Sequence, residues 1–214
     1  EVSRAAAEAR FMAGEASRAL GATFPSERAG CTCQTVLEPL GVVAAISPWN
    51  FPVVTPVRKI APALAYGDTV VFKPATLTPW TAVFLMELLE KAGLPAGVVN
   101  LVIGAGSAVG ECLIRDARVR GISFTGSTAT GMRIYEGAAR RLARVQLELG
   151  GKNAAVVIDY DDLDGAAREI VAAAFLCSGQ RCTALSRVIV IESQAEALVE
   201  QLLDHVGRIK VGDG

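Results

Sequence analysis

The sequence predicts an α/β fold with a doubly wound parallel sheet, followed by the start of a second α/β domain. With 51% hydrophobic and 20% charged residues, the 214-residue chain has enough apolar surface for a buried core. Short β-branched runs bounded by Gly or Pro alternate with longer segments of amphipathic spacing. Such alternation is typical of a parallel sheet with helices on both faces.

The first part of the chain contains one helix, a polar loop and then the alternating elements. Residues 2–20 are Ala-rich, carry charges at helical spacing and stop at Gly21, so we expect one helix there. The expected buried strands are 41–47, 69–73, 98–103 and 121–125. The expected helices are 53–66, 80–92, 107–114 and 127–142.

A second domain is expected to begin near Gly150. The tandem Gly150–Gly151 permits backbone angles closed to other residues, which suits a crossing between domains. We therefore expect one domain at 1–149 and the beginning of another at 150–214. From residue 145 on, the expected strands are 145–149, 154–158 and 187–192, and the expected helices are 163–177 and 195–209.

Composition and charge argue against several classes of protein. A formal net charge of -1 leaves no basic excess for a nucleic-acid backbone, so nucleic acid is not an expected partner. The longest apolar runs fall well short of the roughly 20 residues that span a bilayer, so no membrane segment is expected. The first residues lack an apolar signal core, and the expected location is therefore cytoplasmic.

The five cysteines suggest reduced thiols, because their number is odd and the chain is not a small secreted domain. Cys31 and Cys33 form a C-x-C pair, but the chain has one histidine, His205, and no facing cysteine pair, so no metal site is expected. Cys112 lies in an apolar helical pattern and is expected to be buried.

Polar residues follow the expected strands at their carboxyl ends, where open α/β sheets bind ligands. Asn50 stands between two prolines in Ser47-Pro48-Trp49-Asn50-Phe51-Pro52, which would fix its amide as a donor for an oxyanion. The alternative is a turn Asn that caps the next helix. Lys73 ends the following strand and could meet ribose hydroxyls or a phosphate, or lie in solvent at the edge.

Two further strand ends suggest phosphate binding. The glycine-rich run 104–110 follows a strand and opens a helix, although its spacing is not G-x-G-x-x-G, and alone it is a weak signal. Phe124-Thr125-Gly126-Ser127 also joins a strand to a helix, whose first amides could hold a pyrophosphate, although many helix starts look like this.

A carboxylate and a thiol complete the candidate chemistry. Glu148 ends an apolar strand beside two glycines. Cys182 lies in Gly179-Gln180-Arg181-Cys182-Thr183, and Arg181 beside it would favour the nucleophilic thiolate. His205 is the sole candidate partner for a Cys–His pair, so a cysteine protease has little support. A thiol acyltransferase on an unrelated fold would leave the Asn50 and Lys73 segments unexplained.

Together these segments resemble the aldehyde dehydrogenase superfamily, over nearly the whole chain. The motifs that carry the resemblance are Pro48-Trp49-Asn50-Phe51-Pro52, Lys73-Pro74-Ala75, Phe124-Thr125-Gly126-Ser127, Glu148-Leu149-Gly150-Gly151-Lys152 and Gly179-Gln180-Arg181-Cys182. The resemblance implies a Rossmann-like cofactor-binding domain, a catalytic domain, and dimers or tetramers of the full-length protein. No Glu-x-Phe-Gly-Pro segment of the family occurs here, so the chain is expected to be a central fragment. The alternative function is then a catalytically incomplete dinucleotide-binding fragment.

By this resemblance, Cys182 attacks an aldehyde to give a thiohemiacetal, and Asn50 holds the oxyanion. Hydride leaves to NAD or NADP, and Glu148 activates the water that cleaves the resulting thioester. Relatives that transfer the acyl group to coenzyme A lack Glu here, so hydrolysis is expected. The residues implied in cofactor binding are Ser47, Pro48, Trp49, Lys73, Ala75, Thr76, Gly106, Gly110, Phe124, Thr125, Gly126, Ser127, Thr130, Leu149 and Gly150.

Two positions bear on specificity. NAD-preferring relatives commonly have Glu at the position of Thr76, where it repels a 2'-phosphate, so we expect that NADP is accepted. Arg58 matches an Arg that binds the substrate carboxylate in semialdehyde dehydrogenases, and Arg181 lies beside the nucleophile. The expected substrate is a carboxylated semialdehyde, such as 2-oxoglutarate or succinate semialdehyde. Both arginines could instead be solvated charges.

Overall fold

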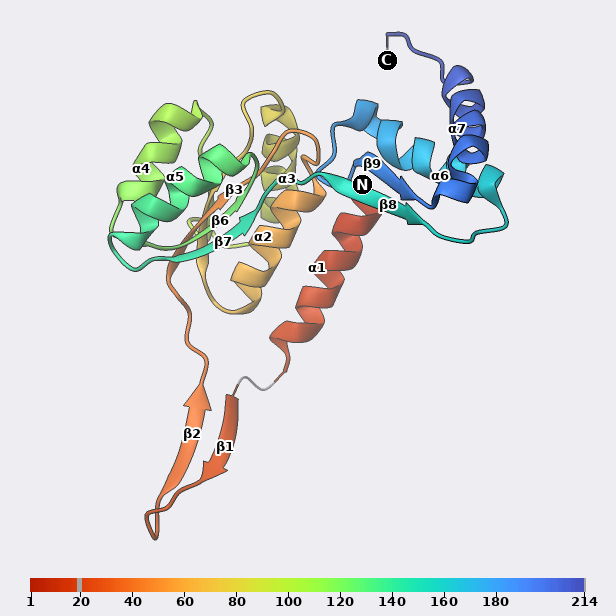
Figure 1. The fold of residues 1–214 in the computed structure, drawn as a ribbon. Coiled ribbons are helices and arrows are strands. Elements are labelled where there is room, and N and C mark those ends of the chain that lie inside the picture. The colour runs from red at the N-terminus through yellow and green to blue at the C-terminus, as the bar shows by residue number, and fades with distance from the viewer. Residues whose placement is uncertain (19–20, 214) are drawn as a thin grey trace. The chain divides into compact units, whose positions relative to one another are not determined.

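The computed structural model describes residues 1–18 and 21–213. The chain divides into two compact units, 1–148 and 149–214 (Figure 1). The expected assignment of 1–149 to cofactor binding and of 150–214 to catalysis stays a prediction.

The first unit is built on a five-stranded parallel sheet, as predicted from the alternating pattern. Its strand order is β5-β4-β3-β6-β7. The chain winds outward from β3 to β5 and then returns to β6 on the other side of β3, so the topological switch lies between β3 and β6. The strands are β3 (Val42–Ile46), β4 (Thr69–Lys73), β5 (Val99–Leu101), β6 (Val119–Thr125) and β7 (Arg144–Glu148).

Helices cover both faces of this sheet (Figure 1). Helices α2 (Val54–Ala65) and α3 (Pro79–Lys91) pack on one face, where Ile60, Val70 and Phe72 belong to one buried cluster. The other face carries α4 (Glu111–Arg115) and α5 (Thr128–Ala139). The single helix expected at 107–114 is divided into a π-helical turn, η1 (Gly106–Gly110), and the short α4.

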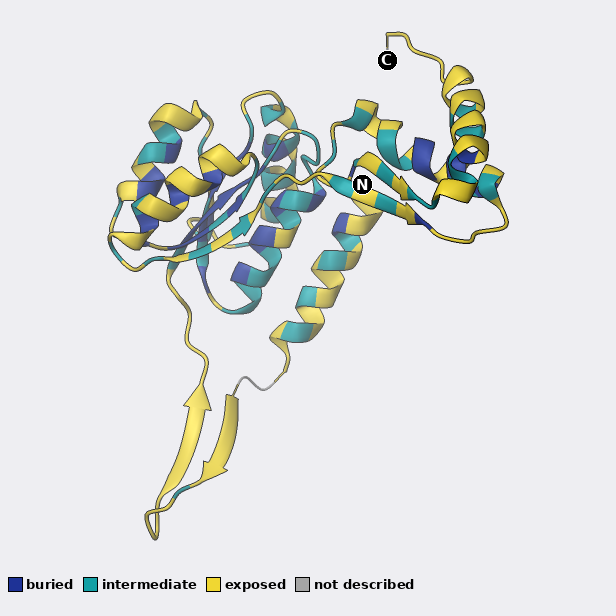
Figure 2. Cartoon of the chain, viewed as in Figure 1, coloured by how far each residue is buried: buried dark blue, intermediate teal, exposed yellow. Residues whose placement is uncertain are grey.

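Residues 1–41 precede the sheet and depart from expectation in one respect. Helix α1 (Val2–Ala16) forms as predicted and packs on α2, while residues 19–20 of the expected helix lie outside the described residues. The expected polar loop is instead an antiparallel hairpin of β1 (Gly21–Pro25) and β2 (Thr32–Val36). Every residue of both strands is exposed (Figure 2), and with neither face buried the sequence shows no alternation that would predict strands.

The second unit pairs two parallel strands, β8 (Asn153–Val157) and β9 (Leu185–Val190). Helices α6 (Leu163–Phe175) and α7 (Glu192–Gly207) pack against one face, and a 3-10 turn, η2 (Leu176–Gly179), follows α6. The buried cluster contains Val157, Ala167, Ile170 and Leu198. Val156 and Ile189 of the strands remain exposed (Figure 2).

The sequence predicted that Cys112 would be buried. Cys112 is exposed, so the prediction that it is buried was wrong. In the five-residue α4 the buried positions are Leu113 and Ile114, and Cys112 lies on the outer side.

Across the described ranges, 1–18 and 21–213, no helix is both long and apolar enough to span a bilayer.

Candidate functional site

A cavity of about 300 Å³ opens at the topological switch of the first unit. Its floor comes from the carboxyl ends of β3, β4 and β6, and its walls come from η1, α4 and α5. Six residues predicted to bind a cofactor line it: Ser47, Lys73, Gly106, Gly110, Phe124 and Thr130. The remaining lining residues are Ile46, Ser107, Glu111, Ile114, Arg133 and Ile134.

The lining of the cavity includes two buried polar groups with spare hydrogen-bonding capacity. Ser47 is 5% exposed, and its Oγ has no hydrogen-bond partner among the described residues. Lys73 is 6% exposed, its Nζ donates to Pro74 O at 3.0 Å, and burial lowers the pKa of its ammonium. An ammonium has three donors, and a buried hydroxyl needs a partner. These groups fit ribose or phosphate oxygens of a dinucleotide.

The start of α5 provides a second feature that suits an anion. Ser127 caps the helix by accepting a hydrogen bond from the Thr130 N–H at 3.3 Å. Gly126 precedes it, and a Cβ there would lie 2.5 Å from the ring of Phe124, so the tight approach of strand to helix requires glycine. The first-turn amides and the helix dipole favour negative charge at this end.

The other predicted cofactor residues do not line the cavity. Pro48 and Trp49 follow β3, and Ala75 and exposed Thr76 follow β4. Thr125 ends β6. Leu149 and Gly150 belong to the second unit.

Asn50 lies half-buried in the turn between β3 and α2. The amides of Val53 and Val54, at the start of α2, both donate to Glu1 Oε1, at 2.8 and 2.9 Å. These two amides are therefore capped by Glu1, the residue before α1.

Sequence reasoning missed a hydrogen-bonded chain that ends at Glu148. Lys59 Nζ donates to Ser123 Oγ at 3.0 Å, and Ser123 Oγ donates to Gln146 Oε1 at 2.5 Å. Gln146 Nε2 then donates to Glu148 Oε1 at 3.1 Å. One signal was available: Lys59 interrupts the apolar face of its helix, where a lysine requires a polar partner.

Burial lowers the pKa of Lys59, the first residue of this hydrogen-bonded chain. Lys59 is 6% exposed, and burial lowers the pKa of its ammonium from the ordinary 10.5 to about 8. The negative charge of Glu148 acts in the opposite direction. A buried cation is thus connected through two neutral side chains to an exposed carboxylate.

Cys182 is exposed in a turn between η2 and β9 of the second unit. The preceding residues Cys177, Ser178 and Gly179 are left-handed, with φ of 57, 54 and 70°. For the two residues with side chains this backbone is strained, a property that clusters at functional sites. Asn153, which sequence reasoning missed, donates from Nδ2 to Cys182 O at 2.7 Å and to Ala184 O at 3.3 Å. Its amide thereby holds the backbone of the turn.

Both arginines expected near the substrate have partners within their own unit. Arg58 donates from Nε to Glu8 Oε1 at 2.8 Å, and their side chains are 47% and 32% exposed. Arg181 donates from a terminal nitrogen to Ala173 O, in the last turn of α6, at 3.0 Å. Its Nε is buried without a partner among the described residues. Arg181 thus helps to hold the Cys182 turn against α6.

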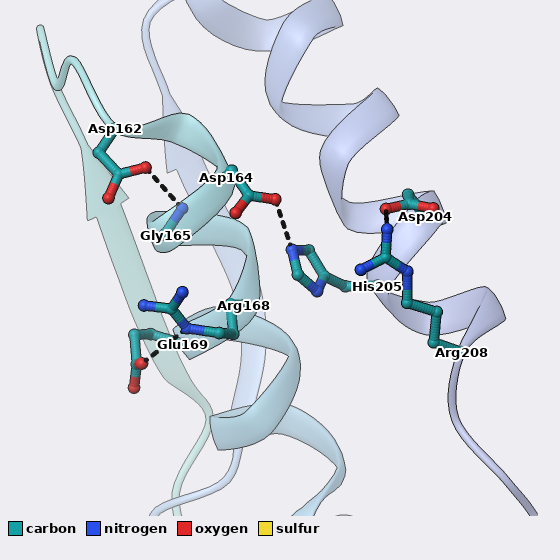
Figure 3. Close-up of polar contacts among 8 residues, drawn as sticks. All are labelled: Asp162, Asp164, Gly165, Arg168, Glu169, Asp204, His205 and Arg208. Carbon is teal, nitrogen blue, oxygen red and sulfur yellow. Dashed lines mark hydrogen bonds and ion pairs between the residues drawn. The ribbon is translucent and has the colours of Figure 1, made fainter.

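His205 is paired elsewhere. Its Nε2 lies 2.8 Å from Asp164 Oδ1, which joins the last turn of α7 to the first turn of α6 (Figure 3). Cys182 follows the opposite end of α6, and a helix of 13 residues spans roughly 20 Å. This separation gives no support to a Cys–His pair. In the part of the chain that the structure describes, no three His, Cys, Asp or Glu side chains group as metal ligands.

In a comparison with known proteins, the model of the aldehyde dehydrogenase family matches residues 1–214. This match agrees with the motifs, with the cavity at the topological switch and with the exposed Cys182 thiol. The chain belongs to the aldehyde dehydrogenase family. The predicted family is thereby confirmed.

Several aldehyde dehydrogenases of known sequence or structure are similar to the chain. It is 47% identical to an alpha-ketoglutaric semialdehyde dehydrogenase of Bacillus subtilis, covering 100% of this chain and 44% of the relative. It is 48% identical to a 2,5-dioxopentanoate dehydrogenase of Saccharolobus solfataricus, covering 100% and 45%. The crystal structure of an E. coli NADP dependent enzyme matches with a TM-score of 0.95 at 40% identity, covering 99% and 44%, which confirms the α/β fold.

The chain spans less than half the length of these relatives. Within it, Asn50 and Glu148 belong to the first unit and Cys182 to the second. That these three aldehyde dehydrogenase residues act on one substrate remains a prediction.

Proposed function

We propose that the full-length protein oxidises a carboxylated semialdehyde to the corresponding acid with NAD or NADP. The observation that carries the proposal is the cavity at the β3–β6 switch, with its buried Lys73 ammonium and a Ser47 hydroxyl that has no hydrogen-bond partner among the described residues. It fits a dinucleotide in a chain whose family oxidises aldehydes. Relatives named for alpha-ketoglutaric and succinate semialdehydes support the substrate class.

We propose which cavity residues hold which part of the cofactor. Ile114, Phe124 and Ile134 are apolar lining residues that suit the flat adenine ring. Lys73 and Ser47 suit ribose or phosphate oxygens. The nicotinamide of the bound dinucleotide supplies the hydride acceptor. Because Thr76 places no carboxylate beside Lys73, we propose that the 2'-phosphate of NADP is accepted.

Three residues carry the chemistry on the substrate. The Cys182 thiolate attacks the aldehyde carbon, and the Asn50 amide and the Cys182 N–H stabilise the oxyanion of the thiohemiacetal. Loss of hydride leaves a thioester on Cys182. Glu148 takes a proton from water, the hydroxide attacks the thioester carbon, and the acid leaves as the thiolate is restored.

Arg58 is proposed to bind the carboxylate of the substrate. Its present partner, Glu8, is one-third exposed, and ion pairs between such side chains contribute little. A substrate carboxylate can therefore replace Glu8 at modest cost. The assignment of Arg181 to the substrate has less support, because one donor already binds Ala173.

The test is aldehyde-dependent formation of NAD(P)H by the purified full-length protein and two variants. Cys182→Ala should abolish the reaction. Glu148→Gln should retain the first turnover, seen as a burst of NAD(P)H, and slow later turnovers at least a hundredfold, because only thioester hydrolysis needs the base. Full activity of Cys182→Ala would overturn the proposal.

One observation favours a second candidate function, a dinucleotide-binding fragment without catalysis. The cavity and its polar groups lie entirely within the first unit. Calorimetric binding of NADP by the 214-residue chain, with no aldehyde-dependent reduction of NADP by that chain, would support this alternative.

A further inference from the structure

The three hydrogen bonds that connect Lys59 to Glu148 all run in one direction. A carboxylate only accepts, so the group of Gln146 that contacts Glu148 must be its NH₂, and its Oε1 is left to face Ser123. The Ser123 hydroxyl accepts from the Lys59 ammonium and therefore donates its own hydrogen to that Oε1. Every donor in the chain thus points toward the carboxylate.

The amide interrupts any path for protons. A proton could pass from the Lys59 ammonium to the Ser123 hydroxyl, because that oxygen both accepts and donates. At Gln146 the carbonyl oxygen accepts and the separate NH₂ group donates, and the nitrogen has no acceptor capacity. Passage would require the amide to change its bonding and release an N–H proton. The chain therefore transmits charge and dipole but not protons.

Aligned hydrogen bonds reinforce one another, and here the alignment begins at a buried cation. The ammonium polarises the hydroxyl, the hydroxyl polarises the amide, and the amide hydrogen faces Glu148 Oε1. A polarised amide hydrogen thus holds one oxygen of the Glu148 carboxylate in place.

We propose that Ser123 and Gln146 are positioning residues that orient the Glu148 carboxylate, without relaying its proton. Gln146 holds Oε1 and leaves Oε2 to take the proton of the attacking water. Glu148 is exposed, so that proton exchanges directly with solvent. This role rests on the proposed function, in which Glu148 is the base for thioester hydrolysis.

The test uses an activated ester, p-nitrophenyl acetate, with the full-length protein and no dinucleotide. The ester acetylates the Cys182 thiol and releases nitrophenol in a burst, and the steady rate then reports hydrolysis of the acetyl thioester. The variants are Gln146→Met and Ser123→Ala, with Gln34→Met in the exposed hairpin as the matched control. Thermal melting checks that each variant is folded.

We expect unchanged bursts in all variants and hydrolysis roughly five- to tenfold slower in Gln146→Met. Ser123→Ala should show a smaller change in the same direction. The double variant should be no slower than Gln146→Met, since both residues act through one chain. Gln34→Met should match the parent.

Three outcomes would overturn the inference. In the first, Gln146→Met hydrolyses the acetyl thioester as fast as the parent. In the second, the two substitutions multiply in their effect on hydrolysis. In the third, hydrolysis in Gln146→Met stops at every pH, as loss of a proton relay would require. Absence of any burst in the parent would instead overturn the proposed function.

Discussion

Replacing Lys59 by Met should stabilise the fold at neutral pH, although it removes a hydrogen bond. Burial lowers the Lys59 pKa from 10.5 to about 8. At 1.36 kcal/mol per pH unit, this drop corresponds to about 3 kcal/mol by which folding disfavours the charged form. The bond to Ser123 returns about 1 kcal/mol. The net gain expected for Lys59→Met at pH 7 is therefore about 2 kcal/mol.

The sign of this effect depends on pH. Below pH 8 the lysine is charged in both folded and unfolded chains, so the parent carries the full cost of burial. Between pH 8 and 10.5 the folded state has released the proton that the unfolded state still binds, so the stability of the parent rises with pH. Above 10.5 both states are neutral, and the advantage of Met disappears.

Urea unfolding of the parent and of Lys59→Met at pH 7 and 10.5 measures the difference in free energy of unfolding. That difference should fall by about 3 kcal/mol between the two pH values, and titrations shared by both proteins cancel. Lys91→Met, at an exposed lysine of α3, is the matched control and should change stability little at either pH. An equal difference at pH 7 and 10.5 would refute the argument that Lys59 is buried with a charge.

Three further changes test the site. Asn153→Ala removes both hydrogen bonds to the Cys182 turn. The rate at which the Cys182 thiol is alkylated, measured by mass spectrometry of its peptide, should then change at least threefold. An unchanged rate would mean that the turn keeps its conformation without Asn153. Arg58→Ala should raise KM for a carboxylated aldehyde at least tenfold more than for a neutral aldehyde of equal length, and Glu8→Gln should lower it; equal effects on both aldehydes would count against the assignment. Gly126→Ala places a Cβ 2.5 Å from an aromatic ring and should weaken NADP binding at least tenfold by calorimetry, whereas unchanged affinity would show that α5 is not part of the site.

The sequence by itself determined the central architecture. Runs such as 69–73 are apolar because parallel strands are buried on both faces, and this one coincides with β4. Helical periodicity located α2 and α3 to within a residue at each end. The sequence motifs predicted that Lys73 and Ser47 bind the cofactor, and both residues line the cavity. Each of these patterns involves residues that are close together in the sequence, so the sequence alone is enough to recognise it.

Other features were decided only by tertiary contacts. The hairpin at 21–36 buries neither face, so its strands carry no alternating pattern. The hydrogen-bonded chain joins Lys59 to residues 64 and more positions away, on β6 and β7. Strand register sets Ser123 opposite Gln146, and no spacing within the sequence specifies that pairing. The candidate base was therefore visible in the sequence, whereas its supporting groups emerged only from the register of β6 with β7 and from the packing of α2 against the sheet.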